Sequence, residues 1–373
     1  MLNIAVIFGG VSCEHDISII TGIQVINNLD KYNVIPIYIT KDGRWLYSDN
    51  YRTIESVVNE KGVECTLSNF SGELLVKGVL GRFKKLLHID GVFVALHGLN
   101  GEDGSICALC NLSNILCFNS QILPSALSLD KIAMKNYLFG LKVSNLIKYI
   151  SVNKSESISD VITKINKKKL VYPLIVKPSN LGSSIGIQIV KSEDELEEKL
   201  NIAYMFDNNL LIEEKLDEIK EYNIAIFKSK DEYVLSDIEE PIGSDEILSY
   251  SDKYLNGEKS SGIEGLTRVF PAKIDENLKL EIQGTALKIY KLLNLSGVVR
   301  FDFIYQSDTD LLYLNELNTT PGSYANYLFQ DISFPNMLDR IIKNAYFEKE
   351  QDKDKIKYFE SSVLSDVNLS IKK

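Results

Sequence analysis

The sequence predicts an α/β protein built from two or three domains, and three observations lead to this prediction. The 373 residues are too many for one ordinary hydrophobic core. The chain opens with an apolar run at 3–8, a Gly-Gly turn and an apolar-periodic helix, which is how a domain with a parallel sheet begins. Near the other end, two alternating apolar runs flank the polar turn at 306–310, which predicts a β-hairpin.

Composition excludes several classes of function and predicts a cytoplasmic protein. The net charge of −10 argues against a general nucleic-acid binder, which needs a basic face. No apolar run is long enough to cross a bilayer. The N-terminal apolar run has no basic region before it, so we interpret it as a strand and not as a signal peptide. Five cysteines in a chain of this length indicate a reducing compartment.

Residues 1–122 are predicted to form an N-terminal α/β domain, in which 41–85 are polar and irregular. Glu14 stands at the start of its first helix, where an acid either complements the helix dipole or receives a substrate ammonium group. His97 lies in a glycine-rich loop just after a buried strand. Ligands of open α/β sheets bind at such loops, and a structural turn histidine is the alternative.

Residues 123–212 are predicted to form the next domain. Its start, 124–141, has the pattern of one helix with Ser128 as N-cap, and Lys131 and Lys135 share a face of it. A solvated pair of lysines is the ordinary interpretation of that spacing. Further on, an apolar strand ends at Lys177 and is followed by a loop of small residues. Converging N–H groups beside a lysine favour a loop that covers phosphates, whereas an ordinary hairpin does not explain the lysine.

Residues 213–348 are predicted to form the C-terminal domain, and 349–373 a charged tail. The polar stretch at about 239–270 is long for a connection inside a domain, which favours a lid that closes over substrate. A helix is expected over 275–294, directly before the hairpin.

Polar side chains share one face of the predicted hairpin. If the hairpin is symmetric about Thr309, Asp302 lies opposite Glu316 and Arg300 lies opposite Asn318, because successive strand side chains alternate between faces. The four groups then stand at the same depth in the sheet.

The oxygen atoms of this face suit a hard cation. Two carboxylates and a carboxamide, from Asp302, Glu316 and Asn318, are ligands for Mg²⁺, which also uses substrate phosphates. A solvent-exposed strand end with a salt bridge is the alternative. The same alternation predicts that Leu312 and Leu314 share the face of Glu316 and Asn318.

Seven segments, in this order along the chain, resemble those of ATP-grasp ligases, most closely the D-alanine–D-alanine ligase family. They are FGGVSCEHDIS, ALHGLNGEDG, PSALSLDKIAMK, LIVKPSNLGSSIG, LLIEEKL, VVRFDF and NELNTTPG, and they span nearly all of 1–348. The resemblance implies an ATP-grasp fold of three domains with an N-terminal parallel sheet, and ATP between the second and third. It also implies a homodimer whose partners are small molecules, and an acyl-phosphate route to D-alanyl-D-alanine, ADP and phosphate for peptidoglycan.

The resemblance also implies roles for individual residues. Those implied for ATP are Lys131, Lys177, Ser183, Ser184, Glu213, Glu214, Leu216 and Glu221. Those implied for two Mg²⁺ ions, or Mn²⁺ in their place, are Asp302, Glu316 and Asn318. Those implied for the amino-acid substrates are Glu14, His97, Lys253, Tyr254, Tyr327 and Leu328. Those implied for catalysis are Glu14, Ser184, Tyr254, Arg300 and Gly322, with Arg300 on the acyl phosphate and the oxyanion.

The sequence departs from the family at the second substrate. Lys253 and Tyr254 resemble the Lys-Tyr of dipeptide-forming members, which favours an amine as the nucleophile. The family usually has a small serine five residues beyond the glycine of NTTPG, and Tyr327 stands there. The second amino acid is therefore D-alanine, D-serine, glycine or another small residue. A ligase of other amino acids and a nucleotide-binding protein without catalysis are the further hypotheses, and the intact Arg300 and Glu316 disfavour the latter.

Overall fold

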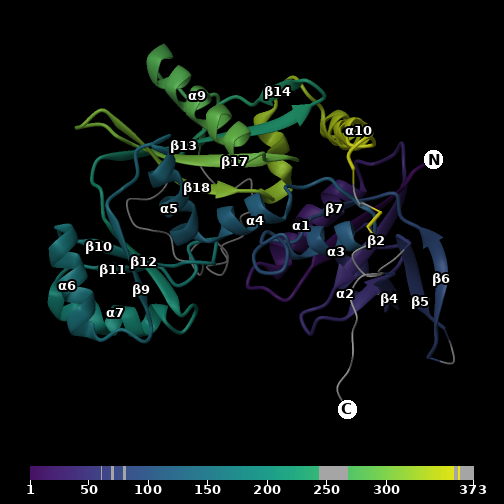
Figure 1. The fold of residues 1–373 in the computed structure, drawn as a ribbon, viewed down its shortest axis with the longest axis horizontal. Coiled ribbons are helices and arrows are strands. Elements are labelled where there is room, and N and C mark those ends of the chain that lie inside the picture. Colours follow the sequence, from purple (N-terminus) through teal and green to yellow (C-terminus); the bar gives the residue numbers. More distant parts are fainter. Residues whose placement is uncertain (60, 69–70, 79–80, 243–267, 357–359, 362–373) are drawn as a thin grey trace.

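In a computed structural model, the described residues form three sheets, each with its own helices, and one two-stranded ribbon (Figure 1). The structure describes residues 1–373 except 60, 69–70, 79–80, 243–267, 357–359 and 362–373. The α/β prediction is confirmed, since helices cover sheets throughout the chain. The domain limits given above stay predictions.

The first sheet has eight strands in the order β6-β5-β4-β3-β2-β1-β7-β8. Its parallel part, as predicted, holds β1 (Asn3–Gly9), β2 (Asn33–Ile39), β7 (Gly91–Val94) and β8 (Leu116–Cys117). Its antiparallel part holds β3 (Trp45–Tyr47), β4 (Val63–Leu67), β5 (Glu73–Lys77) and β6 (Phe83–His88). The prediction that 41–85 are irregular is wrong. These strands, with α2 (Ile54–Asn59), are short and half-exposed, so they lack the apolar run of a buried strand.

The two ends of the chain share one hydrophobic core. Helix α1 (His15–Ile26) packs on β1, and α3 (Ser105–Leu112) lies beside β7 and β8. The C-terminal helix α10 (Phe334–Gln351) joins the same cluster, which contains Phe8, Tyr324 and Ile341. The segment after the hairpin is therefore fixed against the N-terminal sheet.

The expected helix at 124–141 is two helices, α4 (Ile122–Leu129) and α5 (Lys131–Leu141). Asp130 separates them in an extended conformation and caps α5, because its Oδ1 accepts from the N–H groups of Ile132 and Ala133, both at 3.0 Å. Ser128 is not a cap but a buried residue of α4. The break makes Lys131 the first residue of α5.

The middle sheet is antiparallel, in the order β11-β10-β12-β9. Its strands are β9 (Tyr149–Asn153), β10 (Leu174–Pro178), β11 (Gln188–Val190) and β12 (Asn209–Glu214). Helices α6 (Ile158–Lys168) and α7 (Leu196–Ala203), the latter preceded by the short η1 (Glu193–Glu195), complete its core. The predicted strand-loop-strand around Lys177 is confirmed, since β10 pairs with β11 across the loop.

The third sheet is antiparallel, in the order β14-β13-β17-β18. Its strands are β13 (Ile219–Ser229), β14 (Glu232–Leu235), β17 (Val299–Gln306) and β18 (Leu311–Asn318), and α9 (Glu276–Leu292) packs on it. The ribbon pairs β15 (Glu240–Pro241) with β16 (Arg268–Val269), so both ends of the predicted lid are joined. Lys253 and Tyr254 lie outside the described residues.

A β-bulge at Asn315 decides which face the polar groups of β18 occupy. Asp302 pairs with Glu316, but Phe303 pairs with Leu314, so Asn315 is an extra residue in β18. The prediction that Leu312 and Leu314 share the face of Glu316 and Asn318 is therefore wrong. The two leucines are buried in the core, and after the bulge Leu317 takes over that face.

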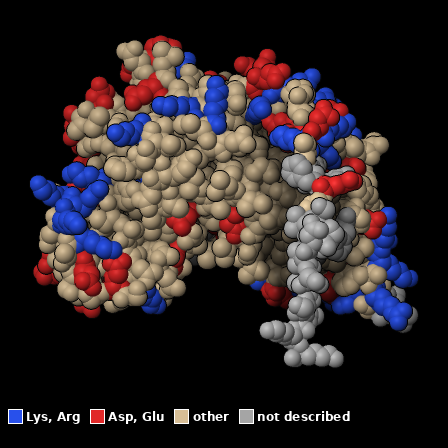
Figure 2. Space-filling model, in the orientation of Figure 1, with Lys and Arg blue, Asp and Glu red and all other residues tan. Residues whose placement is uncertain are grey.

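The molecule is hollowed between the part that carries α6 and α7 and the part that carries β4 to β6 (Figure 2), and acidic side chains are visible at the wall of the hollow. Among the described residues, helices long and apolar enough to span a membrane are absent.

Candidate active site

The polar face of the β17–β18 hairpin holds the pairs that the sequence predicts. Arg300 lies opposite Asn318, and Asp302 lies opposite Glu316. Arg300 donates two parallel hydrogen bonds to Asp302, from Nε to Oδ1 at 2.6 Å and from Nη2 to Oδ2 at 2.7 Å. Burial lowers the pKa of Arg300, but the charge of Asp302 outweighs it and raises that pKa above its usual value. Arg300 is thus a fixed cation with N–H groups left for a ligand.

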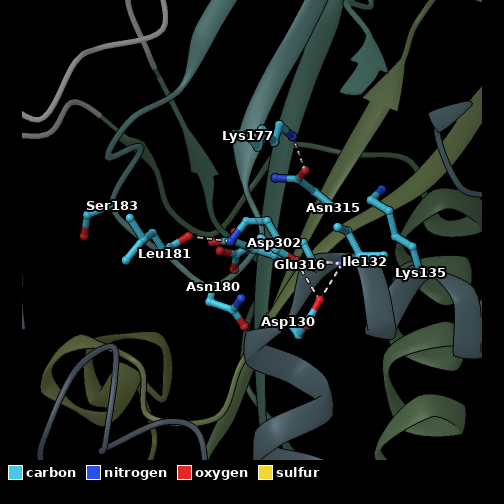
Figure 3. A network of polar contacts seen from close by, with 12 residues as sticks. Asp130, Ile132, Lys135, Lys177, Asn180, Leu181, Ser183, Asp302, Asn315 and Glu316 are labelled. Carbon is cyan, nitrogen blue, oxygen red and sulfur yellow. Dashed lines mark hydrogen bonds and ion pairs between the residues drawn. The ribbon is translucent and has the colours of Figure 1, made fainter. Parts of the chain in front are cut away.

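Two lysines from distant segments reach consecutive residues of β18, and Figure 3 shows one of them, Lys177, directed at Asn315. Lys131 Nζ, at the start of α5, donates to Leu181 O at 2.6 Å and lies 3.6 Å from Glu316 Oε2. Lys177 Nζ, at the end of β10, donates to the bulge residue Asn315 at 3.3 Å. The bulge therefore has a second effect, because it aims Asn315 at the lysine. Both lysines predicted for the phosphates converge on the polar face.

Glu213 forms a buried ion triad with two lysines. Its Oε1 lies 2.6 Å from Lys135 Nζ, and its Oε2 lies 2.6 Å from Lys177 Nζ. The side chains of Glu213 and Lys135 are each only 1% exposed, so the interpretation of Lys135 as a solvated lysine is wrong. Burial raises the pKa of Glu213, but the two lysines outweigh it and lower that pKa to about 2. Glu213 thus orients Lys177. Its contact with adenine, which the resemblance implies, stays a prediction.

Replacing Glu213 with glutamine is expected to lower the free energy of unfolding by about 3 kcal/mol at pH 7. The carboxyl pKa falls from 4.5 to about 2 on folding, so this stabilisation is complete above about pH 5. It is lost as the pH falls through 4.5 towards 2. Urea unfolding of the wild type and Glu213→Gln between pH 3 and 8 measures the difference, which should shrink only at the acid end.

Glu64→Gln is the control for this prediction. Glu64 pairs with Lys77 at the same 2.6 Å, but both side chains are about two-fifths exposed. An exposed pair contributes about 1 kcal/mol or less. An equal loss in both variants would contradict the role of burial.

Glu14 joins the loop that is predicted to cover phosphates to the start of the first helix. Ser183 Oγ donates a short hydrogen bond to Glu14 Oε1. Burial raises the pKa of Glu14, and the charge of Glu316 adds to this increase. The contact makes Ser183 a second candidate for the catalytic role assigned to Ser184. Behind Glu14 stands Glu102, which the sequence did not single out. It accepts from Gly98 N at 2.7 Å, and burial raises its pKa to about 8.

His97 is a buried, neutral link between three segments. Burial lowers its pKa to about 4, so the ring carries no charge near pH 7. Its Nε2 lies 2.8 Å from Thr21 Oγ1 on α1, and the same oxygen accepts from Ser323 N at 3.2 Å. The predicted contact of His97 with a substrate carboxylate would therefore be a neutral hydrogen bond.

The residues predicted for adenine and ribose lie at the connection of the second and third sheets. Glu214 ends β12 and pairs with Lys148 at 3.1 Å. Leu216 follows it and is half-buried, and Glu221 is an exposed residue of β13. The chain thus passes from one sheet to the other through the predicted ATP contacts.

The segment η3 (Gly322–Leu328) carries an unusual backbone. Ser323, Tyr324 and Ala325 are all left-handed, with φ of 53°, 52° and 48°. Such residues cost about 1–2 kcal/mol each, so tertiary contacts must hold them. Tyr324 is fully buried, and its hydroxyl donates to Val94 O at 2.9 Å. Leu328 is also buried in the shared core.

Tyr327 belongs to a cluster that the sequence did not predict. Its hydroxyl donates to Glu239 Oε1 at 3.1 Å, and burial raises its pKa to about 12. Asn223 Nδ2 donates to the same oxygen at 3.0 Å. The guanidinium carbon of Arg268 lies 4.7 Å from the centre of the Tyr327 ring. Four segments meet here, and no local pattern in the sequence brings them together.

Asp302, Glu316 and Asn318 fit a divalent cation by their chemistry. Burial raises the pKa of Asp302 although Arg300 opposes it, and the charge of Glu316 adds to the increase, so a cation beside these two carboxylates would favour their charged forms. Each Asp302 oxygen keeps a lone pair beside Arg300. Asn318 Oδ1 accepts from Thr320 N at 3.0 Å. Within the described residues, clusters of three His, Cys, Asp or Glu side chains suited to a metal are absent, so phosphate oxygens would complete the coordination.

Comparison with known proteins decides the family. The chain matches the family described as D-ala D-ala ligase N-terminus over residues 3–120, and that described as D-ala D-ala ligase C-terminus over 137–343. The chain belongs to the D-alanine–D-alanine ligase family. Members of this family are ATP-dependent ligases with the ATP-grasp fold, so both of these predictions are confirmed.

Relatives in the ligase family match almost the whole chain. The D-alanine–D-alanine ligase of Caldicellulosiruptor bescii is 34% identical over 368 residues, which are 96% of this chain and 98% of that protein. The D-alanine–D-alanine ligase of Staphylococcus epidermidis is 34% identical over 375 residues, which are 95% of this chain and 99% of that protein. The solved ligase of Helicobacter pylori has a TM-score of 0.74 at 29% identity, covering 93% and 99%. The solved VanG D-Ala:D-Ser ligase of Enterococcus faecalis has a TM-score of 0.78 at 29% identity, and the match covers 92% of this chain and 99% of that one.

Proposed function

We propose that the protein joins D-alanine to D-alanine at the expense of ATP, giving D-alanyl-D-alanine, ADP and phosphate for peptidoglycan precursors. The observation that carries the proposal is the meeting of Lys131 and Lys177, from separate segments, at consecutive residues of β18 beside Arg300. Cations that converge from separate segments suit a phosphoryl group in transfer, whose charge is spread over its oxygens.

The chemistry takes two steps. A carboxylate oxygen of the first amino acid bonds to the γ-phosphorus of ATP, and ADP leaves with the electron pair. The amine of the second attacks the acyl carbon, the carbon–oxygen bond to phosphate breaks, and a proton is released. Lys131 and Lys177 hold the phosphates, Glu14 holds the first ammonium, and Arg300 stabilises the oxyanion. Asp302, Glu316 and Asn318 would hold Mg²⁺, which neutralises phosphate charge when bound.

We also propose that the enzyme acts as a homodimer in the cytoplasm, on small molecules alone. The ATP would lie between the second and third of three domains, 1–122, 123–212 and 213–348. The convergence of residues from the last two on the polar face supports this division. Light scattering after gel filtration measures the oligomeric state.

A second candidate function is a ligase that joins D-alanine to D-serine or another small amino acid. The position of Tyr327 favours it, because a large ring there reshapes the space beside Arg300. An acceptor screen tests both functions. ADP release and product mass are measured with ATP and D-alanine alone, then with D-serine, glycine or D-lactate added. Release of no ADP with any D-amino acid would refute both.

Replacing Tyr327 with serine is expected to raise the preference for D-alanine over glycine as acceptor by about tenfold. The ring fills space that a methyl group can then occupy, and discrimination of one such group is worth about this factor. Competition between the two acceptors, with the dipeptides separated by mass, gives the ratio. An unchanged ratio would show that Tyr327 does not line the acceptor pocket.

A further inference from the structure

We propose that Arg268 binds the α-carboxylate of the acceptor amino acid, and that Tyr327 and Glu239 hold its guanidinium in place. This inference rests on the proposed function, since it names the group that receives the second substrate. Arg268 opens β16, and its guanidinium stacks on the ring of Tyr327 in η3.

A chain of contacts joins Arg268 to the reacting centre. The guanidinium stacks on the Tyr327 ring at 4.7 Å, and the Tyr327 hydroxyl donates to Glu239 at 3.1 Å. Glu239 also accepts from Asn223, and Asn223 lies directly opposite Asp302 in the β13–β17 ladder. The Arg268 charge is therefore held on the β13 side of the Arg300–Asp302 pair.

With respect to the residues that the structure describes, the guanidinium of Arg268 has unused N–H donors. Arg300 uses two N–H groups on Asp302, both at 2.7 Å or less, and its side chain is 20% exposed. Arg268, by contrast, is 38% exposed, and among the described residues its polar partner is Glu239, at 3.5 Å. A guanidinium has five N–H groups in a planar fork that matches a carboxylate. Arg268 can thus bind a carboxylate through two parallel hydrogen bonds.

The reaction needs a cation at this place. The acceptor amine must attack beside Arg300, and the α-carboxylate is one carbon away from that amine. Lys131 and Lys177 are engaged on the other side, with Glu316 and Asn315. A carboxylate fixed by Arg268 would orient the amine for attack, and a carboxylate buried without a partner would be costly. The acceptor class is therefore a small amino acid with a free carboxylate.

The test compares two acceptors that differ only in that carboxylate, D-alanine and D-alaninamide. With D-alanine as donor, the rates of the two products, separated by mass, give the ratio of kcat/KM for the acceptors. In Arg268→Gln the preference for D-alanine should fall by about 10- to 100-fold, as expected for a charged hydrogen-bonded pair. In Arg268→Lys the same preference should fall severalfold, because an ammonium group cannot bind a carboxylate in a bidentate manner. The KM for ATP should stay within twofold in both.

Arg340→Gln is the matched control. Arg340 also stacks on a ring, 5.4 Å from Phe227, and pairs with Glu232 at 3.7 Å, far from the hairpin's polar face. Its ratio should equal that of the wild type. Dipeptide synthesis with an unchanged ratio in both Arg268 variants would overturn this inference alone. A wild type that turns over no D-amino acid would overturn the proposed function and this inference with it.

Discussion

Replacing Glu316 with alanine is expected to lower kcat by about 10³-fold or more while the protein stays folded. Glu316 is a predicted cation ligand at the end of β18, beside Lys131 and opposite Asp302. Its side chain is about a third exposed, so its loss leaves no core cavity. ADP release at saturating ATP and Mg²⁺ gives kcat, and thermal unfolding reports the fold. Glu316→Gln keeps the size of the side chain but removes its charge, so it should lower kcat as much as Glu316→Ala.

Glu73→Ala is the control for Glu316. Glu73 is also a half-buried strand carboxylate paired with a lysine, Lys85, but it lies in the first sheet away from the hairpin. It should keep wild-type turnover. Retained turnover of Glu316→Ala at saturating Mg²⁺ would show that the metal site is not on this face.

The hairpin shows both the reach and the limit of prediction from sequence. Symmetry about Thr309 predicts the pairs at Arg300 and Asp302, and the structure confirms them. The turn itself is centred half a residue earlier, since Gln306 pairs with Leu311, and the extra residue Asn315 restores the register. Alternation alone cannot reveal a bulge, because a polar residue in a half-buried strand looks the same with or without one.

Burial and long-range contact account for the other differences. A spacing of four placed Lys131 and Lys135 on one helix face, but only packing against β12 shows that Lys135 is buried beside Glu213. Arg268 and Glu239 lie at the two ends of the long polar stretch 239–270, where the local pattern predicts a lid but singles out neither of these two residues. A segment that combines several residue types can be recognised in the sequence. Contacts such as Lys135 with Glu213 and Arg268 with Glu239 join residues that only the fold brings together, so the sequence does not predict them.

Replacing Tyr324 with alanine is expected to lower the free energy of unfolding by about 4–6 kcal/mol and to weaken acceptor binding. Deleting a fully buried aromatic ring costs about 3–5 kcal/mol, and the hydrogen bond to Val94 adds about 1 kcal/mol. The ring also packs edge-on against Phe93, 5.7 Å between centres. Without these contacts the left-handed backbone of η3 should relax, because fewer contacts, among them the bond from Ser323 N to Thr21 Oγ1, would remain to offset its conformational cost. Denaturant unfolding measures the first effect, and the KM for the acceptor the second.

Tyr324→Phe and Tyr290→Phe separate the two effects of Tyr324. Both hydroxyls are buried and donate to a backbone carbonyl at 2.9 Å, that of Tyr290 to Gly297. In Tyr324→Phe the Val94 carbonyl keeps the hydrogen bond from Asn119 Nδ2 at 2.9 Å, so this variant should lose about 1 kcal/mol, and Tyr290→Phe about 1–3 kcal/mol. Only Tyr324→Phe should raise the acceptor KM, since only Tyr324 holds the backbone that positions Tyr327. If both raised it equally, general destabilisation would explain the effect, and the left-handed turn would have no part in binding the acceptor.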